Sequence, residues 1–251
     1  MPAAKTEMTP FATTAQDKLI IALDVCSAQQ ALSLFAALRD FAGMFKIGSQ
    51  LFTAAGPGIV REIVSAGGRI FLDLKFHDIP NTVAAAGVEA VRLGVSIFNV
   101  HASGGSEMMR RTAAAVTEVS EREGLARPRV IGVTVLTSAG TQQLAETGSE
   151  QKMEQRVTAL AQLAAASGLD GVVASPFEVT AIRQAVVRKD FIVVTPGVRP
   201  SGTEPGDQRR VMTPASALRA GSDYLVVGRP IIAAPDPVQA ARKILETMDG
   251  V

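Results

Sequence analysis

Short apolar segments, many of them rich in β-branched residues, alternate along the chain with longer alanine-rich segments in which apolar residues recur at helical spacing. The short segments are apolar on both faces, which is typical of strands in a parallel sheet that is buried between two layers. The predicted strands are eight in number and cover residues 19–23, 44–47, 70–74, 97–100, 130–135, 171–174, 192–195 and 224–227.

Predicted helices fill the intervals between these strands. Ser27 is placed to cap the first helix, which is expected to end near residue 39. The other predicted helices cover residues 58–66, 82–93, 106–123, 150–167, 177–187, 214–220 and 237–248. Glycines that suit a C-terminal cap follow several of them, at Gly67, Gly94, Gly168 and Gly221.

Eight strand–helix units within about 235 residues predict an α/β protein with a single-domain (β/α)₈ barrel, the TIM barrel. An open, doubly wound sheet is the alternative. The barrel is expected to cover residues 18–251, and no linker divides it. Residues 1–17 lack the basic start and apolar run of a secretory signal, and we expect them to form a flexible tail.

The composition narrows the classes of function. The net charge is +1 with no block of like charges, and tryptophan is absent, so nothing indicates a surface for nucleic acid or for an anionic membrane. No apolar run is long enough to span a bilayer. The single cysteine, Cys26, excludes an intramolecular disulfide and is expected to be a small buried filler. We therefore expect a soluble, cytoplasmic protein.

The segment DLKFHDIPNT, residues 73–82, contains the densest group of charges. Side chains two apart on a strand share a face, so Asp73 and Lys75 should project together, and Asp78 follows after a turn that Pro80 enforces. Desolvating such charges costs more than their pairing returns, which favours a functional role. A lysine held between carboxylates can deliver a proton to a developing carbanion. A surface ion-pair network is the alternative.

Polar residues also lie in or just after the carboxyl-terminal parts of other predicted strands, where barrels carry their chemistry. These residues include Asp24, Lys46, Asn99, His101, Thr137 and Ser138. His101 could act as an acid, a base or a ligand, but a lone histidine at a strand end is more often structural, and His77 is equally ambiguous. A metal site built from Asp73, Asp78 and the two histidines is a further alternative. Lys75 already supplies, among these carboxylates, the positive charge that a metal would bring.

The last third of the chain predicts a phosphate site. A glycine- and proline-rich loop, TPGVRPSGTEPGDQRR (195–210), follows the seventh predicted strand, and VVGRP (226–230) ends the eighth. Loops at these two positions commonly bind phosphate in barrels, and Arg229 can add bidentate contacts. Because no Walker or dinucleotide motif is present, a mononucleotide or sugar phosphate is favoured. The long loop is expected to act as a lid, unless it is an ordinary surface loop.

Together these motifs resemble the orotidine 5′-phosphate decarboxylase family. The resemblance runs from LIIALDV (19–25) through FKIG, DLKFHDIPNT, TVLTS, TPGVRP and GDQRR to VGRP (227–230). It implies a (β/α)₈ barrel that converts orotidine 5′-phosphate to uridine 5′-phosphate and CO₂, the last step in the de novo synthesis of UMP. It also implies that no metal and no organic cofactor takes part.

The resemblance assigns roles to the charged residues. It implies that Asp24 and Lys46 hold the ribose hydroxyls, and that Asp73 lies beside the substrate carboxylate. Lys75 would be the proton donor to C6, within a catalytic group formed by Asp73, Lys75, Lys46 and Asp78.

Further residues would bind substrate. In a homodimer, Asp78 and Thr82 would reach the neighbouring subunit's site, and Ile79 of the same segment would also bind substrate. Thr137 and Ser138 would meet the pyrimidine. The residues implied for the phosphate grip are Arg199, Gln208, Gly228 and Arg229.

Two rival functions remain open at this stage. Keto-gulonate phosphate decarboxylases share the Asp-x-Lys-x-x-Asp signature but act on sugar phosphates through a magnesium-stabilised enediolate. A non-catalytic phosphate-binding barrel is the other rival, although such a protein would not need the charges of Asp73, Lys75 and Asp78.

Overall fold

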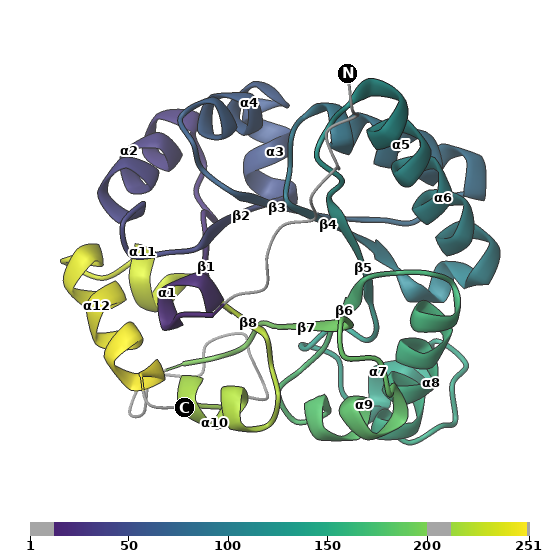
Figure 1. Cartoon of the computed structure of the whole chain (residues 1–251). Coiled ribbons are helices and arrows are strands. Elements are labelled where there is room, and N and C mark those ends of the chain that lie inside the picture. The colour runs from purple at the N-terminus through teal and green to yellow at the C-terminus, as the bar shows by residue number, and fades with distance from the viewer. Residues whose placement is uncertain (1–12, 200–211, 250–251) are drawn as a thin grey trace.

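A computed structural model describes residues 13–199 and 212–249 of the chain. Eight parallel strands form a closed barrel in which each strand pairs with the next and β8 pairs with β1, with helices around the outside (Figure 1). The strands are β1 (Leu19–Ala22), β2 (Met44–Gly48), β3 (Ile70–Phe76), β4 (Ile97–His101), β5 (Arg129–Val133), β6 (Gly171–Val173), β7 (Ile192–Thr195) and β8 (Tyr224–Val227). The prediction of a (β/α)₈ barrel is confirmed, and the open-sheet alternative is wrong.

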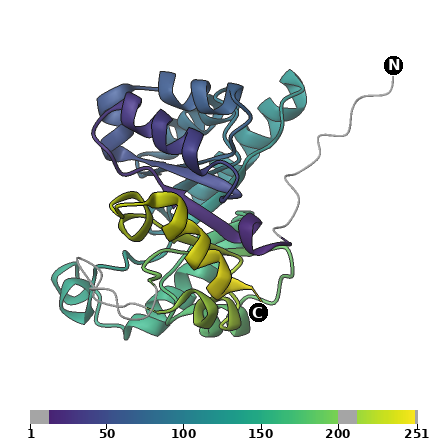
Figure 2. The ribbon, with the colours of Figure 1, turned by 90° about the vertical axis from the view of Figure 1, so that its left-hand side faces the viewer.

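The helices form a ring around the barrel. They are α1 (Ala15–Lys18), α2 (Ala28–Leu38), α3 (Ser49–Ala55), α4 (Gly58–Ser65), α5 (Pro80–Arg92), α6 (Gly105–Glu123), α7 (Thr141–Glu146), α8 (Met153–Ala166), α9 (Val179–Ala185), α10 (Pro214–Arg219), α11 (Arg229–Ile232) and α12 (Pro237–Met248). A 3₁₀ turn at Ala102–Gly104 precedes α6. Helix α12 packs against α10, α11 and α2, so the last helix closes the ring against the first long one (Figures 1 and 2).

The two apolar faces of the strands build two cores. In β1, Ile20 and Ala22 belong to the cluster inside the barrel, whereas Leu19 and Ile21 belong to the cluster between the strands and the helices. Full burial of one such side chain contributes about 1.5–3 kcal/mol. This division explains why the strands lack a polar face.

The predicted caps are found where expected. The hydroxyl of Ser27 accepts a hydrogen bond from the Gln30 N–H at 3.3 Å and so caps α2. The glycines predicted to end helices adopt left-handed conformations, as at Gly67 with φ of 83° and Gly94 with φ of 74°. Close to the end of the predicted tail, Thr14 and Asp17 form a capping box on α1.

Several short elements differ from prediction. The strand predicted to end at residue 74 continues to Phe76, and helices α3, α7 and α11 appear in segments where no helix was predicted. All three follow the carboxyl ends of strands.

Cys26 is exposed, and its Sγ accepts a hydrogen bond from the side-chain amide of Gln50. The expectation that Cys26 is a small buried filler is therefore wrong.

Candidate active site

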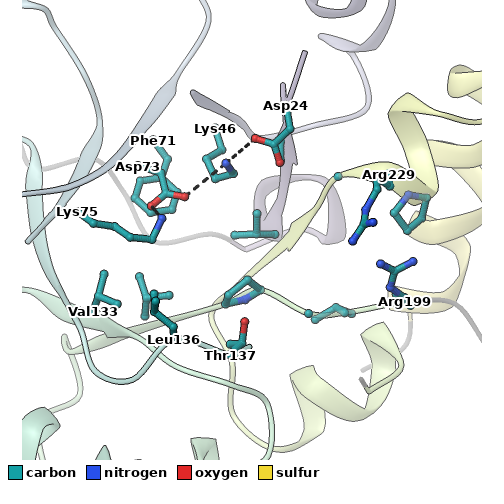
Figure 3. Close-up of a pocket in the computed structure, with 18 of the residues that line it drawn as sticks. Asp24, Lys46, Phe71, Asp73, Lys75, Val133, Leu136, Thr137, Arg199 and Arg229 are labelled. Atoms are coloured by element: carbon teal, nitrogen blue, oxygen red, sulfur yellow. Dashed lines mark hydrogen bonds and ion pairs between the residues drawn. The ribbon is translucent and has the colours of Figure 1, made fainter. Parts of the chain in front are cut away.

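A pocket of about 250 Å³ opens at the carboxyl ends of the strands. Its apolar wall comes from strand positions that point into the barrel, namely Ala22, Phe71, Val133, Val173 and Val226. Charged side chains gather at two ends of the pocket, with an Asp–Lys group at one and two arginines at the other (Figure 3). The shape and charges suit an elongated anionic molecule with a partly apolar body.

The Asp–Lys group is a chain of alternating charges. Lys46 Nζ lies 2.8 Å from Oδ1 of Asp24 and 3.4 Å from Oδ2 of Asp73. Lys75 Nζ donates to the other oxygen of Asp73, Oδ1, at 2.7 Å. The Lys46 and Asp73 side chains are only 11 % and 13 % exposed, whereas that of Lys75 is 34 % exposed. Each buried charge therefore has an opposite neighbour, and Lys75 keeps access to the pocket and to solvent.

Gly48 makes room for this chain of charges. A Cβ added at Gly48 would lie 2.9 Å from Lys46 Nζ and 3.4 Å from Asp24 Oδ1. The first of these distances is shorter than van der Waals contact, so a side chain at Gly48 would force the ammonium of Lys46 to move.

Asp73 and Lys75 meet as predicted, but not through simple strand alternation. The pairing of β3 with β4 shifts its register between Leu72 and Phe76, and Lys75 has a left-handed backbone with φ of 53°. The buried Asn99, on β4, hydrogen-bonds to both residues. The side chains are thus brought together by an irregularity that the sequence pattern did not reveal.

The opposite end of the pocket contains Arg199, Gly228 and Arg229. The Arg199 N–H donates to the carbonyl of Met212 at 3.0 Å, which ties the chain after β7 to the segment before α10. Arg229 is the first residue of α11, next to the end of β8. Gln208 and most of the predicted lid lie outside the described residues.

Thr137 lines the pocket, whereas Ser138 is exposed and does not. Asp78, Ile79 and Thr82 lie at the start of α5 and do not line it either. All three are exposed, and Ile79 is 66 % exposed. Within one subunit, the structure therefore separates this segment from the pocket that holds Asp73 and Lys75.

The histidines lie beside the pocket rather than in its wall. The rings of His77 and His101 are 5.3 Å apart. Burial lowers the pKa of His101, and the nearby His77 and Lys75 lower it further.

Among residues 13–199 and 212–249, no three His, Cys, Asp or Glu side chains are grouped so that they could hold a metal ion. Within the described part of the chain, no helix is both long and apolar enough to cross a membrane.

A model of the orotidine 5′-phosphate decarboxylase / HUMPS family matches residues 17–244 of the chain. The chain belongs to this family. The matched segment contains the whole pocket, including both its Asp–Lys group and its two arginines.

Bacterial relatives named orotidine 5′-phosphate decarboxylase are similar over most of their length. The protein of Moorella thermoacetica is 55 % identical over 238 residues, with 94 % of each chain covered. That of Syntrophotalea carbinolica is 56 % identical over 234 residues, covering 93 % of this chain and 96 % of the relative. These relatives confirm the predicted family and enzyme class.

Solved structures agree with the barrel. The crystal structure of orotidine 5′-phosphate decarboxylase from Lactobacillus acidophilus has a TM-score of 0.81 and 35 % identity, covering 92 % of this chain and 99 % of that one. The enzyme from Pyrococcus horikoshii OT3 has a TM-score of 0.72 and 26 % identity, covering 93 % and 100 %.

Proposed function

We propose that this chain decarboxylates orotidine 5′-phosphate to uridine 5′-phosphate and CO₂, with Lys75 as the proton donor. The observation that carries this proposal is the arrangement of one pocket, with Lys75 and Asp73 at one end and Arg199 and Arg229 at the other. Only a substrate that combines a phosphate with a reacting group some distance away uses both ends.

The substrate is oriented by the charges. Its phosphate lies at Arg229 and Arg199, because guanidinium groups bind phosphate with paired, charge-assisted hydrogen bonds. Its ribose hydroxyls face Asp24 and Lys46, which form an ion pair and lie between Lys75 and Arg229 (Figure 3). Its pyrimidine rests on the apolar wall near Thr137 and brings the C6 carboxylate to Asp73 and Lys75.

Decarboxylation breaks the bond between C6 and the carboxylate carbon and leaves the electron pair on C6. This vinylic carbanion is poorly stabilised, so the protein must place positive charge where the pair develops. The Lys75 ammonium supplies that charge and then transfers a proton, forming the new C6–H bond. The partly exposed Lys75 can recover a proton from solvent.

Preorganised charge is the main source of the rate enhancement in the proposed mechanism. Asp73 and Lys46 hold Lys75 in a fixed field before substrate arrives, so little reorganisation accompanies the reaction. The phosphate lies away from C6, and its binding energy can be used to order the site around the pyrimidine.

The reaction is proposed to need neither metal nor organic cofactor. Lys46 contacts carboxylate oxygens of both Asp24 and Asp73, where a bound cation would otherwise neutralise them. The two lysines therefore provide the positive charge that magnesium supplies in the rival enediolate chemistry.

The active form is proposed to be a homodimer whose subunits complete each other's sites. Asp78, Ile79 and Thr82 are exposed at the start of α5, the helix that follows β3, but do not line the pocket. An isoleucine that is 66 % exposed, next to the polar Asp78, suits an interface. In the dimer, Asp78 and Thr82 would reach the partner's substrate, next to the partner's Lys75.

Incubation with orotidine 5′-phosphate, followed by the loss of its ultraviolet absorbance, tests the reaction. We expect turnover that is unchanged by EDTA, with uridine 5′-phosphate as product. Activity that disappears in EDTA and returns with magnesium would contradict the metal-free mechanism. Binding of uridine 5′-phosphate without any turnover would instead indicate a non-catalytic barrel.

A further inference from the structure

Lys75 has an unusual backbone. Its φ of 53° makes it the only residue other than glycine with a positive φ among residues 13–199 and 212–249. This region is unfavourable for a residue with a Cβ, and such conformations persist only where surrounding contacts enforce them. Some feature of the fold must therefore hold Lys75 in place.

The contacts of Asn99 identify that feature. Asn99 lies on β4 and is fully buried, with no exposed surface. Its Oδ1 accepts from the backbone N–H of Lys75 at 2.8 Å, and its Nδ2 donates to Oδ1 of Asp73 at 2.7 Å. A backbone N–H can only donate and a carboxylate only accepts, so the two partners fix which way the amide faces.

These contacts lie where the ladder between β3 and β4 is irregular. The register shifts between Leu72 and Phe76, so the Lys75 N–H bonds to a side chain of β4 instead. Asp73 Oδ1 accepts hydrogen bonds from both the Asn99 amide and the Lys75 ammonium, each at 2.7 Å. The Asn99 amide thus links the backbone N–H of Lys75 to the carboxylate that accepts a hydrogen bond from the Lys75 ammonium.

We propose that Asn99 is a positioning residue, which holds Lys75 in its left-handed conformation and aligns Asp73 with its ammonium. The inference rests on the proposed role of Lys75 as proton donor. Asn99 itself does not line the pocket and need not touch substrate. Its effect is on the placement of the reacting proton, to which rates are sensitive, since a displacement of about 1 Å can cost on the order of 10²-fold.

Two variants separate hydrogen bonding from packing. Asn99→Ala removes the amide and leaves a space, whereas Asn99→Leu keeps a similarly branched side chain but cannot donate or accept. Thr112→Val serves as a control, because Thr112 is also fully buried and its hydroxyl donates only within the fold, to the carbonyl of Met108 at 2.8 Å. It lies on α6, in the layer of helices outside the strands, and does not line the pocket.

Each variant is tested for kcat, for KM with orotidine 5′-phosphate, and for thermal unfolding. We expect both Asn99 variants to lose about 10²-fold in kcat with KM changed less than about threefold, because the ribose and phosphate contacts remain. Thr112→Val should keep kcat within about twofold of wild type, even if its stability falls. Crystal structures of the Asn99 variants should show Lys75 leaving the left-handed region.

Three results would overturn the inference while leaving the proposed function intact. They are an Asn99→Ala protein with wild-type kcat, recovery of kcat by Asn99→Leu, and an unchanged Lys75 backbone in either variant. A wild-type protein without activity on orotidine 5′-phosphate would instead reject the proposed function, so the two failures are distinguishable.

Discussion

The Nζ of Lys75 donates a hydrogen bond to Oδ1 of Asp73 at 2.7 Å, although the residues are only two apart and Lys75 has a left-handed backbone. The left-handed backbone and the register shift before Phe76 accompany this contact. The same carboxylate also faces Lys46 at 3.4 Å. The proposed proton donor is therefore held by contacts that exist before any substrate binds.

Gly48→Ala tests whether the placement of Lys46 matters. The added Cβ would lie 2.9 Å from Lys46 Nζ, so the ammonium must move away from Asp24 and Asp73. Because Gly48 has a φ of −95°, alanine fits the backbone there and the fold should persist. We expect kcat/KM to fall about tenfold, the effect of losing about 1.4 kcal/mol of transition-state stabilisation.

Gly58→Ala is the matched control for this substitution. A Cβ at Gly58 meets nothing within 4 Å, and Gly58 begins α4 outside the pocket. Its kcat/KM should equal that of the wild type. Equal losses for the two variants, or no loss for Gly48→Ala, would show that the position of Lys46 does not limit turnover.

Arg229→Ala should weaken catalysis only when the substrate has a phosphate. A hydrogen bond to a charged group contributes about 1.5–3 kcal/mol, which corresponds to a loss of about 10- to 100-fold in kcat/KM for orotidine 5′-phosphate. The slow reaction of the phosphate-free nucleoside orotidine should be unchanged. Equal losses with both substrates would mean that Arg229 instead supports the rim of the barrel.

Mixing two inactive variants tests the shared site of the proposed dimer. In a mixed dimer of Lys75→Ala and Asp78→Asn, one site carries both lesions and the other combines an intact Lys75 with an intact Asp78. Random exchange makes roughly half of the dimers mixed, each with one intact site, so activity should approach about a quarter of wild type.

Subunit exchange must be shown independently, for example with variants tagged to differ in size. Confirmed exchange without any recovered activity would mean that Asp78 acts only within its own subunit. Mixing Lys75→Ala with Asp73→Asn is the control. Lys75 and Asp73 belong to the Asp–Lys group of one subunit, so each site of a mixed dimer still carries one of the two substitutions. No activity should return in this mixture.

His101 should make the protein less stable at mildly acidic pH. Burial, followed by the nearby charges of His77 and Lys75, lowers its pKa in the folded protein below the ordinary 6.5, while Asp73 opposes the shift. The unfolded chain therefore binds more protons between the two pKa values, and the free energy of unfolding declines as pH falls through 6.5 toward the folded value. Urea unfolding at several pH values should show that the free energy of unfolding depends less on pH in His101→Asn than in the wild type. An identical pH dependence in the two proteins would rule out this contribution of His101.

The barrel was predictable from the sequence because strands buried on both faces must be apolar on both faces. The strands at residues 192–195 and 224–227 were located without error for this reason. The short helices were missed because four to seven residues are too few to show a helical period. Helix α3 begins at Ser49, and the N-cap residue before it, Gly48, has no side chain that could have marked the start of the helix.

The site was predicted in part. The pattern of charged residues in or just after the carboxyl-terminal parts of strands located Asp24, Lys46, Asp73, Lys75 and Arg229, since these ends of barrel strands share one face. Asn99 was visible only as a polar residue near a strand end. Its partners lie 24 and 26 positions away, and their contact depends on the register shift between β3 and β4. No local pattern encodes that shift.

The most direct test of the proposed mechanism is the turnover of orotidine 5′-phosphate by Lys75→Ala, with Lys243→Ala as the control. Lys243 is exposed on α12 and contributes nothing to the pocket. Removing Lys75 takes away both a proton donor and a preorganised charge, so kcat should fall by about 10⁴-fold or more while thermal unfolding shows a folded protein. Lys243→Ala should match the wild type. A folded Lys75→Ala protein with kcat within about tenfold of wild type would contradict the central claim.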